Sequence, residues 1–371
     1  MRKPIRIAVG AAAGFLGLVL VGQALAAYAP KLAVRMGDAG TTIKLAIPPT
    51  DDPTAKLTFY APAGTGANLS ASAGTIIGTL DAKASAGALG GAALPLTGTV
   101  QARTAGGTYL SSGRPRPLAL ASKACTGTAA HAAWWVLVLS AAGQTFEVPV
   151  FVDPSPAGLP FSPLLAYRLV LCLPPPDIPE AAGGAPFGAK VFEASFTVKN
   201  VFSPTTAGAN LWRLVGTPYN PGVGTPNAAA TVEAQSYVET GSVALGIPSR
   251  TLTGTAASFH ATGTIKISGL PDSQASIALA RGTTATKLSI FAHPMVKPDG
   301  TFDSRFVIKR AKRAQNVFVR ATATAPQRDL AVTACQATFG VPCIGATAGG
   351  FVDVSSVRKI TVPAAPPPKK R

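Results

Sequence analysis

The four cysteines are the residues of this chain whose chemistry depends most on their compartment. They are Cys125, Cys172, Cys335 and Cys343. An even number of cysteines in an oxidising compartment indicates disulfide bonds, and four cysteines allow three pairings. We predict the pairs Cys125–Cys172 and Cys335–Cys343, since each pair lies inside one of the two domains proposed below. The first pair closes a long loop and stabilises the fold through the unfolded chain, whereas the second is a local clip.

The remaining candidate ligands do not form a metal site. No cysteine pair has the C-x-x-C spacing, and the three histidines, at positions 131, 260 and 293, show no ligand spacing. No cofactor fingerprint is present either. We therefore predict no metal ligand, no cofactor-binding residue and no cofactor.

Catalytic chemistry has little support in the residue pattern. No G-x-S-x-G motif marks a nucleophile, and His131 lies beside an apolar segment, where it is best interpreted as a strand-edge residue. Glycoside hydrolysis needs two opposed carboxylates. Candidate groove acids are present, but their pairing cannot be read from the sequence; they are Glu147, Asp153 and Glu193. We predict no catalytic residue and expect that the chain is not an enzyme.

A dense basic run spans residues 309–313. Its four cations are Lys309, Arg310, Lys312 and Arg313, and a strand is expected on either side. A solvated hairpin loop is the simplest interpretation. The sharper alternative is an anion-binding tip, aided by Arg305 and Arg320. Nucleic-acid recognition is not favoured, because no stacking aromatic residues accompany the cations.

The N-terminus indicates export. Arg2, Lys3 and Arg6 precede an uncharged apolar run over residues 7–22, and Ala24-Leu25-Ala26 follows as a cleavage point. This is the layout of a secretory signal peptide over residues 1–26, with an uncleaved anchor as the alternative. No second long apolar run exists, so we predict no membrane span after cleavage.

Composition favours a globular β protein with a basic surface. The 371 residues are 47% hydrophobic and only 13% charged, with a formal net charge of +17. Removing the three cations of the signal peptide leaves +14. A basic exported protein can bind anionic wall polymers or acidic glycans, but simple solubility is the favoured explanation for most of the charge.

Short apolar or alternating segments separated by turns predict an all-β fold. Residues 133–139 and 145–152 are expected to form a hairpin, and Val191 to Phe202 alternates with Phe192, Phe196 and Val198 on the inner face. The three tryptophans, at 134, 135 and 212, lie in such strands, so core packing is favoured over a sugar-stacking platform. Glycines interrupt residues 82–93, where we expect a loop.

We predict two β-sandwich domains of immunoglobulin-like type after the signal peptide. The boundaries are 27–240 for the first domain and 241–362 for the second, followed by a disordered Pro-rich basic tail over 363–371. Six short strands are expected in the second domain, and Pro298-Asp299-Gly300 predicts a hairpin turn. The oligomeric state is not predictable from these patterns.

The second domain resembles bacterial immunoglobulin-like and carboxypeptidase-regulatory-like sandwich modules of exported actinobacterial proteins. The resemblance is carried by residues 263–269, the segment Asp299-Gly300-Thr301-Phe302 and the strand of residues 317–321. It covers about a third of the chain. Such modules serve adhesion, spacing or binding, so the resemblance implies no catalytic residues.

Two functional hypotheses follow. The first is an exported, non-catalytic binding or structural protein of the bacterial cell envelope or medium, which attaches to anionic wall polymers or glycans. The second is a secreted hydrolase or carbohydrate-active enzyme whose active site is assembled only by the fold.

Overall fold

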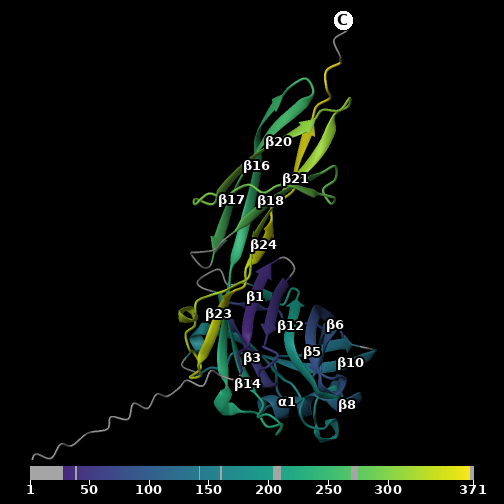
Figure 1. The fold of residues 1–371 in the computed structure, drawn as a ribbon, viewed down its shortest axis with the longest axis vertical. Coiled ribbons are helices and arrows are strands. Elements are labelled where there is room, and N and C mark those ends of the chain that lie inside the picture. The colour runs from purple at the N-terminus through teal and green to yellow at the C-terminus, as the bar shows by residue number, and fades with distance from the viewer. Residues whose placement is uncertain are drawn as a thin grey trace, which may run out of the picture.

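The computed structural model describes residues 28–37, 40–141, 143–158, 161–203, 210–268 and 275–367. The predicted signal peptide, residues 1–26, and the last four residues of the basic tail lie outside these ranges. The described residues form β-strands and one α-helix, α1 (Leu118–Thr126), so the all-β prediction is confirmed. No helix within the described ranges combines the length and the apolar character needed to cross a membrane. Figure 1 shows two regions stacked along the long axis.

The larger region is built on one 13-stranded sheet. Its strand order is β1 (Lys31–Gly37), β2 (Gly40–Ala46), β12 (Ala189–Val198), β5 (Ile76–Ala86), β6 (Ala92–Arg103), β9 (Ala133–Ala141), β10 (Gln144–Pro154), β11 (Leu165–Cys172), β3 (Thr54–Pro62), β14 (Asn210–Pro218), β15 (Val232–Val238), β23 (Cys343–Ala348) and β22 (Arg328–Asp329). Among the strand pairs of the described residues in this sheet, only β15–β23 is parallel. Two ribbons accompany the sheet, β4 (Gly66–Ala67) with β13 (Phe202–Ser203) and β7 (Thr108–Ser111) with β8 (Arg114–Pro117).

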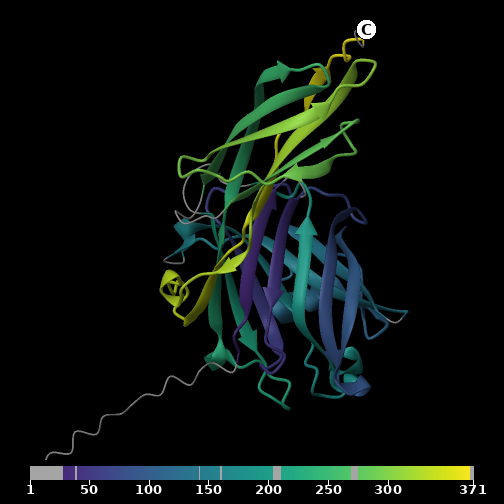
Figure 2. The same cartoon turned by 45° about the horizontal axis from the view of Figure 1, so that its top comes forward.

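This sheet curls until β1 lies beside β15. The Val34 N–H donates to the Ser236 hydroxyl at 2.8 Å, and the Thr347 hydroxyl donates to the Leu32 carbonyl at 2.6 Å. The inward-facing side chains of eleven strands consequently share one core, which includes Phe59 and Trp212. Where two packed layers were expected, the larger region has a single sheet folded on itself (Figure 2).

The predicted local elements are found, with two corrections. The hairpin of β9 and β10 is confirmed, with Leu137 opposite Val148. The predicted loop over residues 82–93 is too long: residues 87–91 do connect two strands, but Ala82, Ala84 and Ala86 are buried inner-face residues of β5. In β12 an irregularity after Val191 turns Val191 toward the core in place of Phe192, while Phe196 and Val198 are buried as expected.

The smaller region consists of two sheets around a second core. One sheet has the order β16 (Thr240–Leu252), β17 (Ala256–Ser268) and β20 (Thr301–Lys309). The other contains β19 (Ser289–Ala292), β18 (Ser276–Gly282), β21 (Gln315–Ala325), β24 (Phe351–Val354) and β25 (Arg358–Val362). Both sheets contribute phenylalanines to the shared core, among them Phe302 and Phe351. Gly300 has a φ of +78°, so the turn predicted at residues 298–300 has the conformation that glycine favours.

The chain crosses between the regions three times. It leaves the larger region after β15, returns to it for residues 326–349, and then re-enters the smaller region at β24. The returning segment holds β22 and β23, so residues that the sequence places in the second domain complete the first sheet. At the crossing, the Arg328 guanidinium donates two hydrogen bonds of 2.9 Å to the buried Glu239 carboxylate.

Candidate functional site

The wall of the curled sheet is split between β10 and β11. These strands pair only over the four residues from Phe151 to Pro154, so the first half of β10 is paired with β9 alone. After Cys172 the chain leaves the sheet and cannot close the gap. A cavity of about 530 Å³ opens here, bordered by residues 145–149 of β10 on one side and by Lys56 and Cys172 on the other. We call it the side cavity.

The walls of the side cavity are mostly apolar. Inward-facing residues of four neighbouring strands line its interior; they are Ala84, Ala86, Leu94, Leu96, Leu139, Phe146 and Val148. The small alanines of β5 leave space that larger side chains would fill. Both the volume and the apolar lining are typical of sites that bind small molecules.

A Pro-rich loop and helix α1 form the outer rim of the side cavity. The loop over residues 174–188 lies across it, held where the Tyr219 hydroxyl donates to the Leu173 carbonyl at 2.6 Å. The Phe187 side chain lines the cavity while remaining 47% exposed, and its backbone has a φ of +56°. On the helix side, the predicted Cys125–Cys172 disulfide is confirmed and ties α1 to the end of β11.

Three charged side chains line the side cavity among the described residues: Lys56, Glu147 and Lys190. The Glu147 carboxylate accepts the Leu110 N–H at 2.6 Å and lies 3.5 Å from an Arg103 nitrogen. The Lys190 ammonium donates to the backbone carbonyls of Pro49 and Asp51. Burial lowers the pKa of Lys190. Burial, together with the nearby Arg168 charge, also lowers the pKa of Lys56.

A buried polar array lies behind the rim. The His131 Nδ1 is 2.9 Å from the Asp153 Oδ2, and its Nε2 is 2.7 Å from the Ser122 Oγ. This connectivity matches that of a hydrolytic triad. However, Ser122 is fully buried, and its hydroxyl donates to the Thr128 carbonyl. The array therefore links α1 to the sheet through hydrogen bonds between Ser122 and His131 and between His131 and Asp153. Sequence reasoning missed Ser122, because no local signal pairs it with His131.

The other sequence-predicted acids do not form a carboxylate pair with Asp153. Glu147 lines the side cavity, and Glu193 is an exposed residue paired with Lys83 at 2.7 Å. Within the described ranges, no group of three or more His, Cys, Asp or Glu side chains could hold a metal ion. The three tryptophans are at most 6% exposed, which favours core packing over sugar stacking.

The structure separates the four cations predicted as an anion-binding tip. The Arg310 guanidinium donates to three backbone carbonyls, those of Thr253, Pro363 and Ala364, so it holds the C-terminal segment. Lys309, Lys312 and Arg313 are exposed. The two helpers lie on different sheets: Arg305 on β20 and Arg320 on β21.

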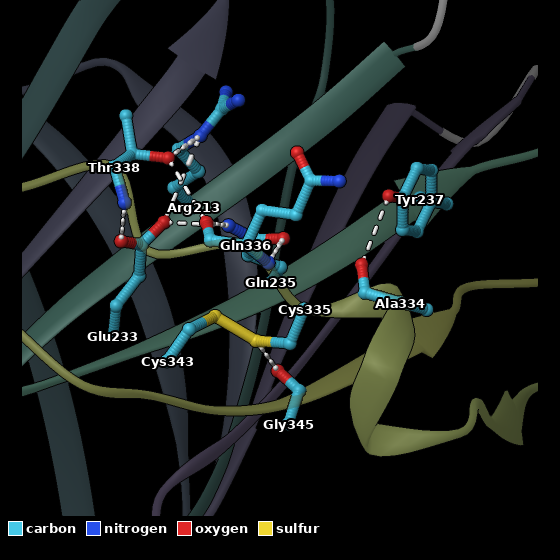
Figure 3. The surroundings of a disulfide bond; sticks show 10 residues. All are labelled: Arg213, Glu233, Gln235, Tyr237, Ala334, Cys335, Gln336, Thr338, Cys343 and Gly345. Atoms are coloured by element: carbon cyan, nitrogen blue, oxygen red, sulfur yellow. Dashed lines mark hydrogen bonds and ion pairs between the residues drawn. A yellow bond between two sulfur atoms is a disulfide. The ribbon is translucent and has the colours of Figure 1, made fainter.

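The second predicted disulfide, Cys335–Cys343, is confirmed, and Figure 3 shows it with the polar side chains around it. The Glu233 carboxylate, which is 0% exposed, accepts hydrogen bonds of 2.7 Å from the Gln235 amide and the Thr338 N–H. The Arg213 Nε lies 3.7 Å from Glu233 and donates to the Thr338 hydroxyl at 3.0 Å. The disulfide loop therefore covers a buried ion pair on β14 and β15.

No protein-family model, curated protein or solved structure matches this chain. The candidate site is therefore supported by the structure alone.

Proposed function

We propose that this chain is an extracytoplasmic, non-catalytic binding protein that holds an apolar small molecule in the side cavity. The observation that carries the proposal is the 530 Å³ apolar cavity at the split between β10 and β11. The two disulfides support an oxidising compartment.

Binding is tested with N-phenyl-1-naphthylamine, an apolar dye that fluoresces when it leaves water. We expect saturable binding to the full chain and at least tenfold weaker binding to Val148→Trp, which fills the cavity from a half-buried position. Val307→Trp is the matched control, because Val307 is an exposed residue of the smaller region. Absence of dye binding to the wild-type chain, or equal binding to both variants, would refute the proposal.

Export is part of the same proposal. We expect the mature chain to begin at Ala27 and to be recovered from envelope or medium fractions with both disulfides formed. N-terminal sequencing and thiol titration of that material check this expectation. A full-length chain with four free thiols would contradict it.

Attachment to anionic wall polymers or glycans is a second candidate function, and the charge distribution favours it. Residues 240–325 and 350–362, the smaller region, contain 13 Lys or Arg and four Asp or Glu. Residues 28–239 and 326–349 contain 14 and 12. The positive charge is thus concentrated on the region that the resemblance relates to immunoglobulin-like adhesion and spacing modules.

The test is retention of the protein on a polyanionic resin over a salt gradient. Reversing Lys309, Lys312 and Arg313 to Glu should shift elution to clearly lower salt, whereas reversing Lys44, Lys83 and Lys199 of the larger region should shift it less. Equal shifts for the two triple variants would mean that net charge alone, and no particular surface, drives retention.

The hydrolase alternative predicts a reactive Ser122. We expect no labelling of the folded protein by a fluorophosphonate, because Ser122 is fully buried and its hydroxyl is engaged by Thr128. We expect Ser122→Ala to lower stability instead, because it removes a buried hydrogen bond. Labelling that Ser122→Ala abolishes would establish the enzyme and displace the binding proposal.

A further inference from the structure

We infer that the side cavity takes an amphipathic anion: an apolar chain inside the curled sheet and a carboxylate or phosphate head at the rim, beside Lys56. The inference rests on the proposed function and specifies its ligand. Of the three charged described residues that line the cavity, two already have partners.

Glu147 and Lys190 are both engaged. The Glu147 carboxylate is held by the Leu110 N–H and by Arg103, and the Lys190 ammonium is held by two carbonyls of the 49–51 turn. Neither charge needs a ligand. Each instead fixes the backbone around the cavity.

Lys56 differs from both. It lies on β3 opposite Cys172 of β11 and opposite Thr217 of β14, at the edge of the split. Within the part of the chain that the structure describes, its ammonium makes no recorded hydrogen bond or ion pair. It is half-buried, and the charge that acts on its pKa is another cation, Arg168. An Arg168 guanidinium nitrogen lies 3.3 Å from the Asp153 carboxylate, so this ion pair neutralises the Arg168 charge in part.

The position of Lys56 therefore costs free energy in the empty protein. Burial removes water from its charge, and Arg168 repels it; the depressed pKa of Lys56 records both effects. An anionic head group would replace the lost water and offset the repulsion. Because Lys56 borders the split, a chain that entered between β10 and β11 would leave its head group beside this ammonium.

The experiment compares ligands that share one chain. Dodecanoate, dodecyl phosphate, dodecanol and dodecyltrimethylammonium are titrated as competitors of N-phenyl-1-naphthylamine at pH 7 and low salt, all below their micelle concentrations. We expect dodecanoate or dodecyl phosphate to bind at least tenfold more tightly than dodecanol, and the cationic ligand to bind most weakly. The relative affinity of the two anions identifies the preferred head group.

Variants locate the head group. Lys56→Met should abolish the preference for anions while leaving dodecanol affinity within about twofold, and Lys56→Arg should keep the preference. Lys199→Met is the matched control, since Lys199 is exposed and does not line the cavity. On binding dodecanoate, the pKa of Lys56 should rise toward its ordinary value, as measured by side-chain NMR.

The outcomes separate the two proposals. If dodecanol binds as tightly as the anions, the anion inference is wrong while the binding function stands. If the preference for anions survives Lys56→Met, the head group lies elsewhere and the inference is also wrong. If neither the dye nor any ligand binds, both proposals fail together.

Discussion

The larger and smaller regions differ in what they bury. The larger region encloses a cavity, a Ser122–His131–Asp153 array and the Arg213–Glu233 pair, and it holds both disulfides. The smaller region has no cysteine, and its core is apolar, rich in phenylalanine and alanine. Its charge lies mainly on its surface. Buried polar groups and empty volume both cost stability, so covalent cross-links occur where those costs are greatest.

The aromatic residues make this comparison measurable. All Trp and Tyr side chains belong to the larger region; they are Tyr28, Tyr60, Tyr109, Trp134, Trp135, Tyr167, Trp212, Tyr219 and Tyr237. Tryptophan fluorescence therefore reports on the larger region alone, whereas hydrogen exchange at β17 and β21 reports on the smaller one.

The largest expected effect is the loss of the long-range disulfide. Cys125 and Cys172 are 47 residues apart, and the double Ser variant should cost about 4 kcal/mol of unfolding free energy. The double variant of Cys335 and Cys343, eight residues apart, should cost about 2.5 kcal/mol. Denaturant titration followed by tryptophan fluorescence measures both. Equal costs would mean that loop length does not govern these cross-links.

The next effect tests the buried ion pair. Glu233→Ala leaves the Arg213 guanidinium buried beside an empty acceptor site and should cost about 3 kcal/mol. The control is Glu193→Ala, whose exposed pair with Lys83 should contribute at most about 0.5 kcal/mol. A cost for Glu233→Ala as small as that of the control would show that the pair is dispensable.

A third change should destabilise the smaller region selectively. A Cβ added at Gly263 would lie 2.2 Å from the Phe302 ring and 2.3 Å from the Ala244 carbonyl oxygen. Gly263→Ala should therefore cost about 2 kcal/mol through overpacking. Gly254→Ala, with no neighbouring atom within 4 Å, is the control. Hydrogen exchange at β17 should accelerate while the tryptophan signal is preserved; a changed tryptophan signal would mean that the two regions unfold as one.

Alkaline pH should destabilise the larger region through its buried tyrosines. Burial raises the pKa of Tyr28, Tyr60 and Tyr219 above the ordinary value. A raised pKa in the folded state gives stability that is complete below about pH 10 and is lost as pH rises above it. Phenolate absorbance should show three late-titrating tyrosines, with loss of the tryptophan signal when they ionise. Tyr28→Phe should shift that loss to higher pH; an unchanged midpoint would exclude Tyr28 as a cause.

The smallest effect is expected at acid pH in the smaller region. A hydrogen bond from Lys297 lowers the pKa of Asp303, and bonds from Thr301 lower that of Asp299. Lowered carboxyl pKa values give stability that is present above about pH 4 and lost below it. Both acids are exposed, so only the hairpin around Gly300 should loosen. The protection of the Thr301 amide, measured as its exchange rate relative to that of an unprotected amide at the same pH, should fall below pH 4 in the wild type and be low at all pH values in Asp299→Asn.

Much of the secondary structure could be predicted, because hydrophobic periodicity and turn residues depend only on residues that are close in sequence. Alternation located β12, and the glycine at 300 marked a real turn. Both disulfide pairs were predicted correctly. The expected loop over residues 82–93 shows the limit: its glycines mark the true connection at residues 87–91, but the alanines before them line a strand, beside a cavity inside the sheet.

Non-local features could not be predicted from one chain. Nothing in Ala346-Thr347-Ala348 indicates that this segment pairs with β15. Similarly, Ser122, His131 and Asp153 meet only because α1 packs on the outer face of β9 and β10. The side cavity depends on where the β10–β11 ladder stops, which is a property of register and not of composition.

The parallel pairing of β23 with β15 has a consequence for biogenesis. These neighbours in the sheet are separated in sequence by the stretch from Val238 to Cys343. A nascent chain delivered N-terminus first must make nearly all of the smaller region before it can cover the edge of β15. A product truncated anywhere in between would expose that edge, together with Glu233, to proteases and to other copies. Only a chain that extends through β23 can therefore cover this edge of β15.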